Sequence, residues 1–100
     1  MLVIAGTIQL DPKDRGAAIA AATEMMRHSN AEDGCHTYVF SADLEDEGLF
    51  RIFEEWESEE ALGAHFKSAH MAAFQKTLGG LAIRETVIDR YEVSEKSKLL

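Results

Sequence analysis

The sequence has little cysteine and little proline: one of each among 100 residues. A lone cysteine, Cys35, excludes a disulfide bond within the chain and any metal site built from cysteines alone. With one proline and no low-complexity tract, extended disorder is not expected. We therefore predict one folded domain over residues 1–100, in which residues 94–100 form a flexible tail.

Basic residues are also scarce, because ten Lys and Arg stand against eighteen Asp and Glu, for a net charge of -8. The basic residues are scattered, so nucleic acid and anionic membrane surfaces are poor partners. The apolar start, MLVIAGTIQL, covers about ten residues and lacks both a basic leader segment and a cleavage pattern. We interpret it as a strand and expect a cytoplasmic protein that does not cross a membrane.

The hydrophobic pattern predicts four strands and two helical regions. Alternating apolar residues indicate strands at residues 2–10, 35–42, 49–56 and 82–93, and helical spacing indicates helices at 12–30 and 59–78, the second broken at Ser68. The order β-α-β-β-α-β is that of a ferredoxin-like α+β fold, an antiparallel sheet with helices on one face. Because the first and third strands carry apolar residues on both faces, we expect a second copy to cover the other face, in a homodimer.

Three stretches resemble the antibiotic biosynthesis monooxygenase (ABM) family, in particular its quinol-monooxygenase-like members. They are EDGCHTYVF, EEWESEEALGAHFKSAHMAAF and the final strand's VIDRYEV. The resemblance implies a dimeric α+β barrel with a pocket between sheet and helices in each subunit. It also implies an enzyme that oxygenates a quinol-like or polyphenolic aromatic with molecular oxygen and no cofactor, because the electron-rich substrate anion reduces oxygen itself.

The middle stretch contains two histidines, His65 and His70, on either side of Ser68. A helical metal pair favours a spacing of four, and no third ligand is near in sequence, so we expect no metal site. As an acid/base group, His65 lies on the inward face of a short helix, where burial would keep it a neutral base. The alternative is a packing residue bonded to a backbone carbonyl. His70 either contacts a substrate oxygen or lies on the surface near a helix end.

Several aromatic and polar side chains are candidates for the wall of a substrate pocket. They are Trp56, Phe74, Tyr38, Thr7, Phe53 and Phe66. Aromatic residues at helical spacing are also ordinary core residues, and that alternative stays open. Glu54 shares a strand face with apolar residues and needs a partner, for which Arg84 and Arg90 are candidates.

Three functions follow from these observations. The first is a cofactor-free monooxygenase with His65 as base and His70 assisting. The second is an isomerase or hydratase of a small oxygenated metabolite, and the third is a non-catalytic dimer that binds a small molecule. Haem degradation is not expected, because Thr7, His65 and Gln75 stand where that branch of the family has asparagine, tryptophan and histidine.

Overall fold

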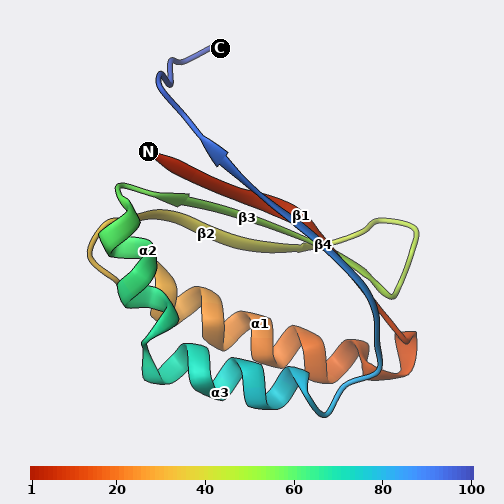
Figure 1. Ribbon diagram of the computed structural model, residues 1–100. Helices are drawn as coiled ribbons and strands as arrows, with labels where there is room; N and C mark the ends of the chain where they lie inside the picture. Colours follow the sequence, from red (N-terminus) through yellow and green to blue (C-terminus); the bar gives the residue numbers. More distant parts are fainter.

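The structure, a computed structural model, describes residues 1–100 (Figure 1). Its strands are β1 (Leu2–Leu10), β2 (Cys35–Ala42), β3 (Leu49–Trp56) and β4 (Ile83–Glu92). Its helices are α1 (Arg15–Asn30), entered through the short 3-10 helix η1 (Pro12–Asp14), then α2 (Glu59–Phe66) and α3 (Ala69–Leu78). The predicted order is confirmed, and the strand boundaries agree to within one residue.

The four strands form one antiparallel sheet in the order β2-β3-β1-β4. All three helices lie against the same face of this sheet (Figure 1). The ferredoxin-like α+β fold is therefore confirmed. The alternation of side chains along each strand gives the molecule an inner face under the helices and an outer face that no helix covers.

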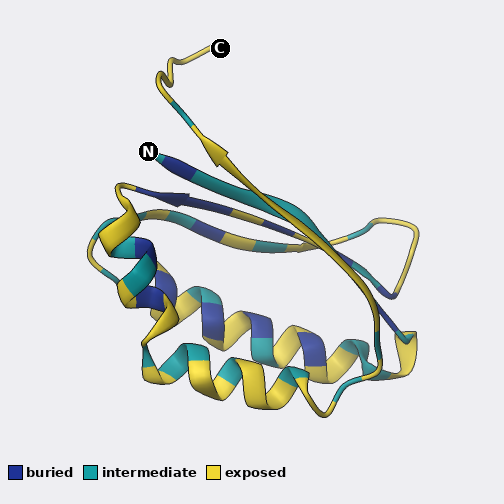
Figure 2. Cartoon of the chain, viewed as in Figure 1, coloured by how far each residue is buried: buried dark blue, intermediate teal, exposed yellow.

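The core lies between the inner sheet face and α1. One cluster comprises Leu2, Met25, Tyr38, Ile52, Trp56 and Leu62, and a second comprises Leu10, Ala18 and Phe50. Figure 2 shows the buried residues on the sides of α1 and the sheet that face each other. The small residues Ala18 and Ala22 let α1 pack closely on the strands, in the manner of an amphipathic helix.

The break between α2 and α3 is made by a serine. Ser68 is the N-cap of α3: its hydroxyl accepts a hydrogen bond from the Met71 N–H and donates one to the His65 carbonyl. Ser58 caps α2 in the same way, through the Ala61 N–H. Each side chain satisfies a backbone group that the helix end leaves free, so the helix start expected at residue 59 and the break expected at Ser68 are both confirmed.

The loop between α1 and β2 turns through Gly34, which has a φ of 80°. This left-handed conformation favours glycine. A β-carbon at this position would also lie 2.6 Å from the Ala61 Cβ. The Gly34 carbonyl accepts a hydrogen bond of 2.8 Å from the Glu57 N–H. The loop that contains Glu32 is therefore fixed against the start of α2.

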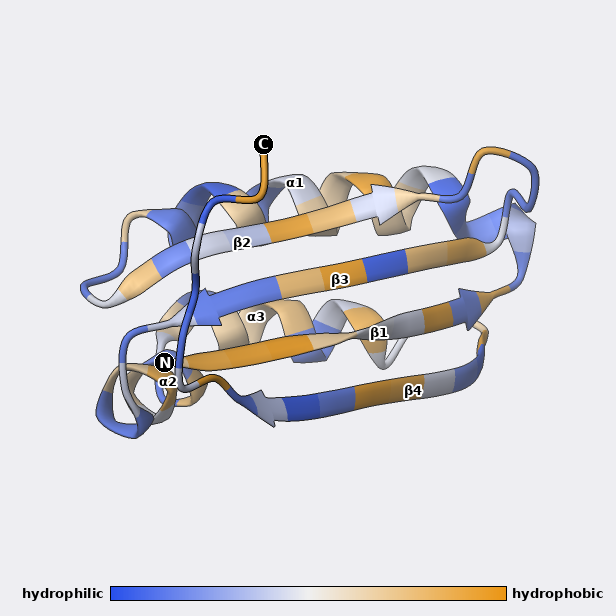
Figure 3. Ribbon diagram, turned by 90° about the horizontal axis from the view of Figure 1, so that it is seen from above, coloured by the Kyte–Doolittle hydropathy of each residue, from blue (hydrophilic) through white to orange (hydrophobic).

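The outer face of the sheet carries exposed apolar side chains; Figure 3 views the sheet from this side, with each residue coloured by its hydropathy. They are Val39, Phe53, Val87 and Tyr91, with exposures of 37% to 50%. The C-terminal tail runs across one end of this face, where Lys96 forms an ion pair of 3.1 Å with Glu55. The flexibility of residues 94–100 stays a prediction. None of the helices has the length and apolar character needed to span a bilayer.

Candidate functional site

Three side chains from separate parts of the chain meet at one end of the helical layer. Glu32 comes from the loop after α1, His65 from the last turn of α2 and His70 from the first turn of α3. The Glu32 carboxylate oxygens lie 3.1 and 3.3 Å from His65 Nδ1, and one of them also contacts His70 Nε2. The carboxylate therefore lies between two imidazole rings.

His65 is the most enclosed of the three, with 1% of its surface exposed. Its ring centroid is 4.8 Å from that of Trp56 and 5.4 Å from that of Tyr38. Burial lowers the pKa of His65, the contact with the Glu32 carboxylate opposes this, and the His70 ring adds a smaller lowering. The net effect is a lowered pKa and a neutral His65 at neutral pH, as the sequence predicted. Its partner is a carboxylate rather than a backbone carbonyl.

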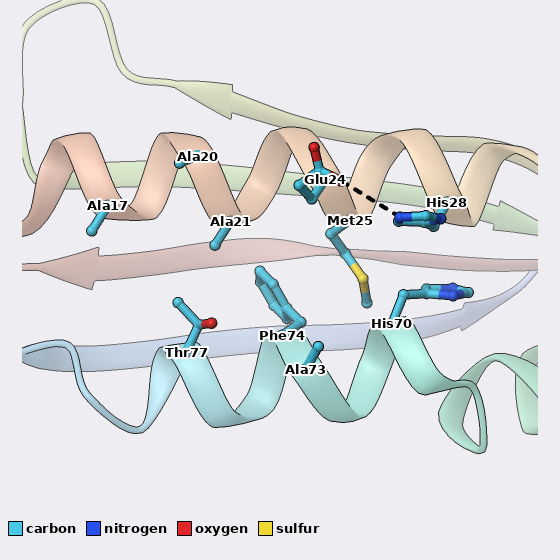
Figure 4. A pocket seen from close by; sticks show the side chains of 10 residues that line it. All are labelled: Ala17, Ala20, Ala21, Glu24, Met25, His28, His70, Ala73, Phe74 and Thr77. Atoms are coloured by element: carbon cyan, nitrogen blue, oxygen red, sulfur yellow. Dashed lines mark ion pairs between the residues drawn. The ribbon is translucent and has the colours of Figure 1, made fainter.

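A groove of about 540 Å³ separates α1 from α3, and His70 lines one end of it (Figure 4). Its remaining lining residues are Ala17, Ala20, Ala21, Glu24, Met25, His28, Ala73, Phe74 and Thr77. The rings of His28 and His70 stack across the groove with centroids 5.4 Å apart and planes 18° apart. The small alanine side chains of α1 leave a flat, mostly apolar wall, which is the kind of surface that a planar aromatic ligand packs against.

The structure brings only some of the predicted site residues together. His70 and Phe74 line the groove, whereas His65 lies behind His70 and does not line it. Trp56 and Tyr38 are core residues in contact with His65, which agrees with the packing alternative for both.

The other three candidates lie away from the groove. Thr7 and Phe53 point to the outer sheet face, because their β1 and β3 neighbours Ile8 and Ile52 point inward. Phe66 ends α2 with 58% of its surface exposed. None of these three side chains lines the groove between α1 and α3, so their expected places in a pocket wall are not found there.

Glu54 has a different partner from the one expected. Its carboxylate accepts a hydrogen bond of 2.8 Å from Trp56 Nε1. Arg84 pairs with Asp11 and Arg90 pairs with Glu59, so neither arginine reaches Glu54. Burial raises the pKa of Glu54 to about 7, with a further rise from the nearby Glu32 charge, against the lowering effect of the Trp56 hydrogen bond.

Sequence reasoning missed Glu32 and His28. Glu32 belongs to the EDGCHTYVF stretch that carries the family resemblance, but no site role follows from it, because no spacing rule connects residue 32 to residues 65 and 70. His28 lies one helical turn before Glu32, and its place opposite His70 follows from the packing of α1 against α3. The only signal in the sequence is that His28 in the last turn of α1 and Glu32 just after its end lie close together in the chain.

Comparisons with known proteins agree on one family. The family model described as antibiotic biosynthesis monooxygenase matches residues 1–77. The chain is 28% identical over 95 residues to YcnE of Bacillus subtilis, a proposed monooxygenase, in a match that covers 95% of this chain and all of that one. It is 29% identical over 98 residues to an uncharacterised protein of Synechocystis sp., of which the match covers 67%.

Solved structures support the same fold. A protein of Bacteroides thetaiotaomicron, described as a possible oxidoreductase, is 29% identical, with a TM-score of 0.83 over 92% of this chain and 96% of that chain. A Deinococcus radiodurans structure, titled as an antibiotic biosynthesis monooxygenase of proposed function, has a TM-score of 0.90. The match covers 100% of this chain and 99% of that chain. Because the sequence identity is only 24%, this likeness concerns the fold alone.

Proposed function

The chain belongs to the antibiotic biosynthesis monooxygenase family, and from this premise we propose that it is a cofactor-independent monooxygenase of a quinol-like or polyphenolic aromatic. The observation that carries the proposal is the groove between α1 and α3, where a histidine backed by a carboxylate meets an apolar wall. Such a reaction needs a base, an apolar surface for the ring and little else.

In this proposal the substrate ring lies along the alanine side of α1, with its hydroxyl group toward His70. His70 accepts the hydroxyl proton, because its ring is the member of the cluster that lines the groove. Glu32 and His65 are positioning residues: the carboxylate orients the His70 ring and offsets the charge that it gains. The role of base, predicted from the sequence for His65, is therefore assigned to His70 in this proposal.

The substrate supplies all the electrons for the reaction. Its anion reduces molecular oxygen, and a new C–O bond forms on the ring. One oxygen atom stays on the oxidised product, a hydroxyquinone, and the other leaves as water after the O–O bond breaks. The proton held by His70 is available for that water.

Oxygen uptake with reduced menadione tests the proposal. Metal-stripped protein should consume oxygen above the protein-free rate, since quinols also oxidise spontaneously. His70→Ala should lower this uptake by about 100-fold, a typical contribution of a general base. His36→Ala is the matched control, because His36 is exposed on β2 and lies outside the groove. Equal uptake in His70→Ala and His36→Ala would refute the role of His70, and no enzyme-dependent uptake would refute oxygenation of this quinol.

A second function is favoured by the same cluster. A carboxylate between two histidines is suited to moving a proton from one substrate atom to another, which is the chemistry of an isomerase or hydratase. Product analysis under anaerobic conditions separates the two, because only the monooxygenase requires oxygen. Turnover without oxygen would favour the isomerase, whereas ligand-induced stabilisation without turnover would favour a binding protein.

We also propose that the protein is a homodimer through the outer sheet face. The support is the row of apolar side chains that no element of the chain covers, with Phe53 at 42% exposed near its middle. Light scattering should give the mass of a dimer for the natural chain and of a monomer for Phe53→Arg. Phe66→Arg, at an exposed phenylalanine on α2, is the control and should stay dimeric. A monomeric natural chain would contradict the proposal.

A further inference from the structure

We propose that Glu32, His65 and His70 together bind one divalent transition-metal ion of the zinc class. This goes beyond the proposed function, which uses no metal, and it rests on the geometry and charge of the cluster. The donor set is two imidazoles and one carboxylate. That set holds zinc in several hydrolases and ferrous iron in many oxygenases.

The distances within the cluster fit an ion. The three donor atoms all lie within 4.8 Å of one another, and His65 Nδ1 is 3.1 Å from the nearer Glu32 oxygen. Around a tetrahedral zinc with bonds of about 2.0–2.1 Å, neighbouring ligand atoms stand about 3.4 Å apart. The side chains of Glu32 and His70 are partly exposed, at 18% and 19%, and their rotation would place the three donors around one centre.

One donor nitrogen has no hydrogen bond. His70 Nε2 is buried and contacts a Glu32 oxygen as an ion pair, but it has no hydrogen-bond partner. A buried polar atom without a partner is uncommon in proteins. A cation beside both atoms would give the nitrogen lone pair and the carboxylate a common partner.

Charge and access also favour a cation. The carboxylate is the formal anion of the cluster, and the net charge of -8 raises the local concentration of cations around the protein. His70 lines the groove between α1 and α3, so an ion can enter from the groove side (Figure 4). Three protein ligands leave a fourth position free, which is the arrangement of catalytic rather than structural zinc sites.

The ion would bind His70, the residue that the proposed oxygenation uses as its base. Saturating Zn²⁺ should therefore abolish enzyme-dependent oxygen uptake. The two proposals can fail separately, because metal binding is measured without substrate and oxygen uptake is measured on metal-stripped protein.

Equilibrium dialysis of the metal-stripped protein against Zn²⁺ tests the site, with Co²⁺ absorption as a second readout. We expect one ion per chain and visible Co²⁺ bands of the strong, low-coordinate type. Glu32→Gln and His70→Ala should each weaken Zn²⁺ binding by at least about tenfold, and His36→Ala should leave it unchanged. Zn²⁺ should raise the melting temperature of the natural chain and not that of Glu32→Gln.

Two results would overturn the inference. One is equal Zn²⁺ affinity in Glu32→Gln and the natural chain, which would assign binding to surface histidines. The other is no stoichiometric binding at micromolar Zn²⁺. Glu32→Gln keeps the size and shape of a partly exposed side chain, and circular dichroism of the metal-free variants confirms that each is folded before binding is compared.

Discussion

Replacing Glu54 by glutamine should make the stability of the protein less dependent on pH. Glu54 is 5% exposed and its pKa is raised from 4.5 to about 7. A raised pKa means that the folded protein keeps a proton that the unfolded chain releases. The favourable contribution of this proton is therefore present below pH 4.5, the unfolded value, and is lost as the pH rises through about 7.

The magnitude follows from the two pKa values. At about 1.36 kcal/mol for each pKa unit, their difference corresponds to roughly 3 kcal/mol between the low-pH and high-pH limits. Between about pH 5.5 and about pH 8, the free energy of unfolding should fall by roughly 2 kcal/mol more in the natural chain than in Glu54→Gln. Glutamine can still accept the Trp56 Nε1 hydrogen bond, and any cost of its buried NH₂ group is the same at both pH values.

Urea denaturation at the two pH values measures this difference, and Glu55→Gln is the matched control. The neighbouring Glu55 points to the opposite face, and hydrogen bonds from Thr37 and Lys96 lower its pKa. Its contribution is fully present above the unfolded pKa of 4.5 and is lost only as the pH falls through the lowered pKa of the folded state, so Glu55→Gln should cost the same stability at both pH values. If Glu54→Gln changed the free energy of unfolding equally at both pH values, the raised pKa of the buried Glu54 carboxyl would be refuted.

Two further substitutions test local features of the fold. Ser68→Ala should lower the free energy of unfolding by about 1 kcal/mol, because it removes the cap of α3; an unchanged urea midpoint would contradict this. Gly34→Ala should cost more than about 1 kcal/mol, because of its positive φ and the Ala61 contact. By contrast, Gly63→Ala, inside α2 with open space around it, should stabilise by about 0.5–1 kcal/mol in the same urea measurement.

The fold could be predicted because its signals are local. The fold's signals are the alternation in residues 2–10 and 49–56, the start of η1 at Pro12, which Asp11 caps, and the two serine caps. Each acts within a few residues. Together they determine the order of the elements, and short connections then favour this antiparallel topology. The predicted arginine partner of Glu54 was wrong. The prediction assumed that a carboxylate needs a positive charge, whereas the donor is the Trp56 ring N–H, two residues away on the same strand face.

The site could be predicted only in part, because it depends on a bend. Along a continuous helix, five residues turn by about 500°, so His65 and His70 would point in different directions. The cap at Ser68 starts a new helix between them, and their ring centroids come to 5.7 Å. Glu32, which is 33 residues before His65 in sequence, joins them through the Gly34 turn, for which no periodicity gives a signal.

The Lys96–Glu55 ion pair holds the C-terminal tail against the outer face of the sheet. The tail lies across one end of the sheet face that we propose as the dimer interface (Figure 3). The tail and a second copy of the chain therefore compete for this part of the face. A second copy must displace these residues or include them in the interface. Salt weakens an ion pair at the surface. A higher salt concentration should therefore release the tail and promote self-association. Salt usually has the opposite effect on contacts between oppositely charged surfaces.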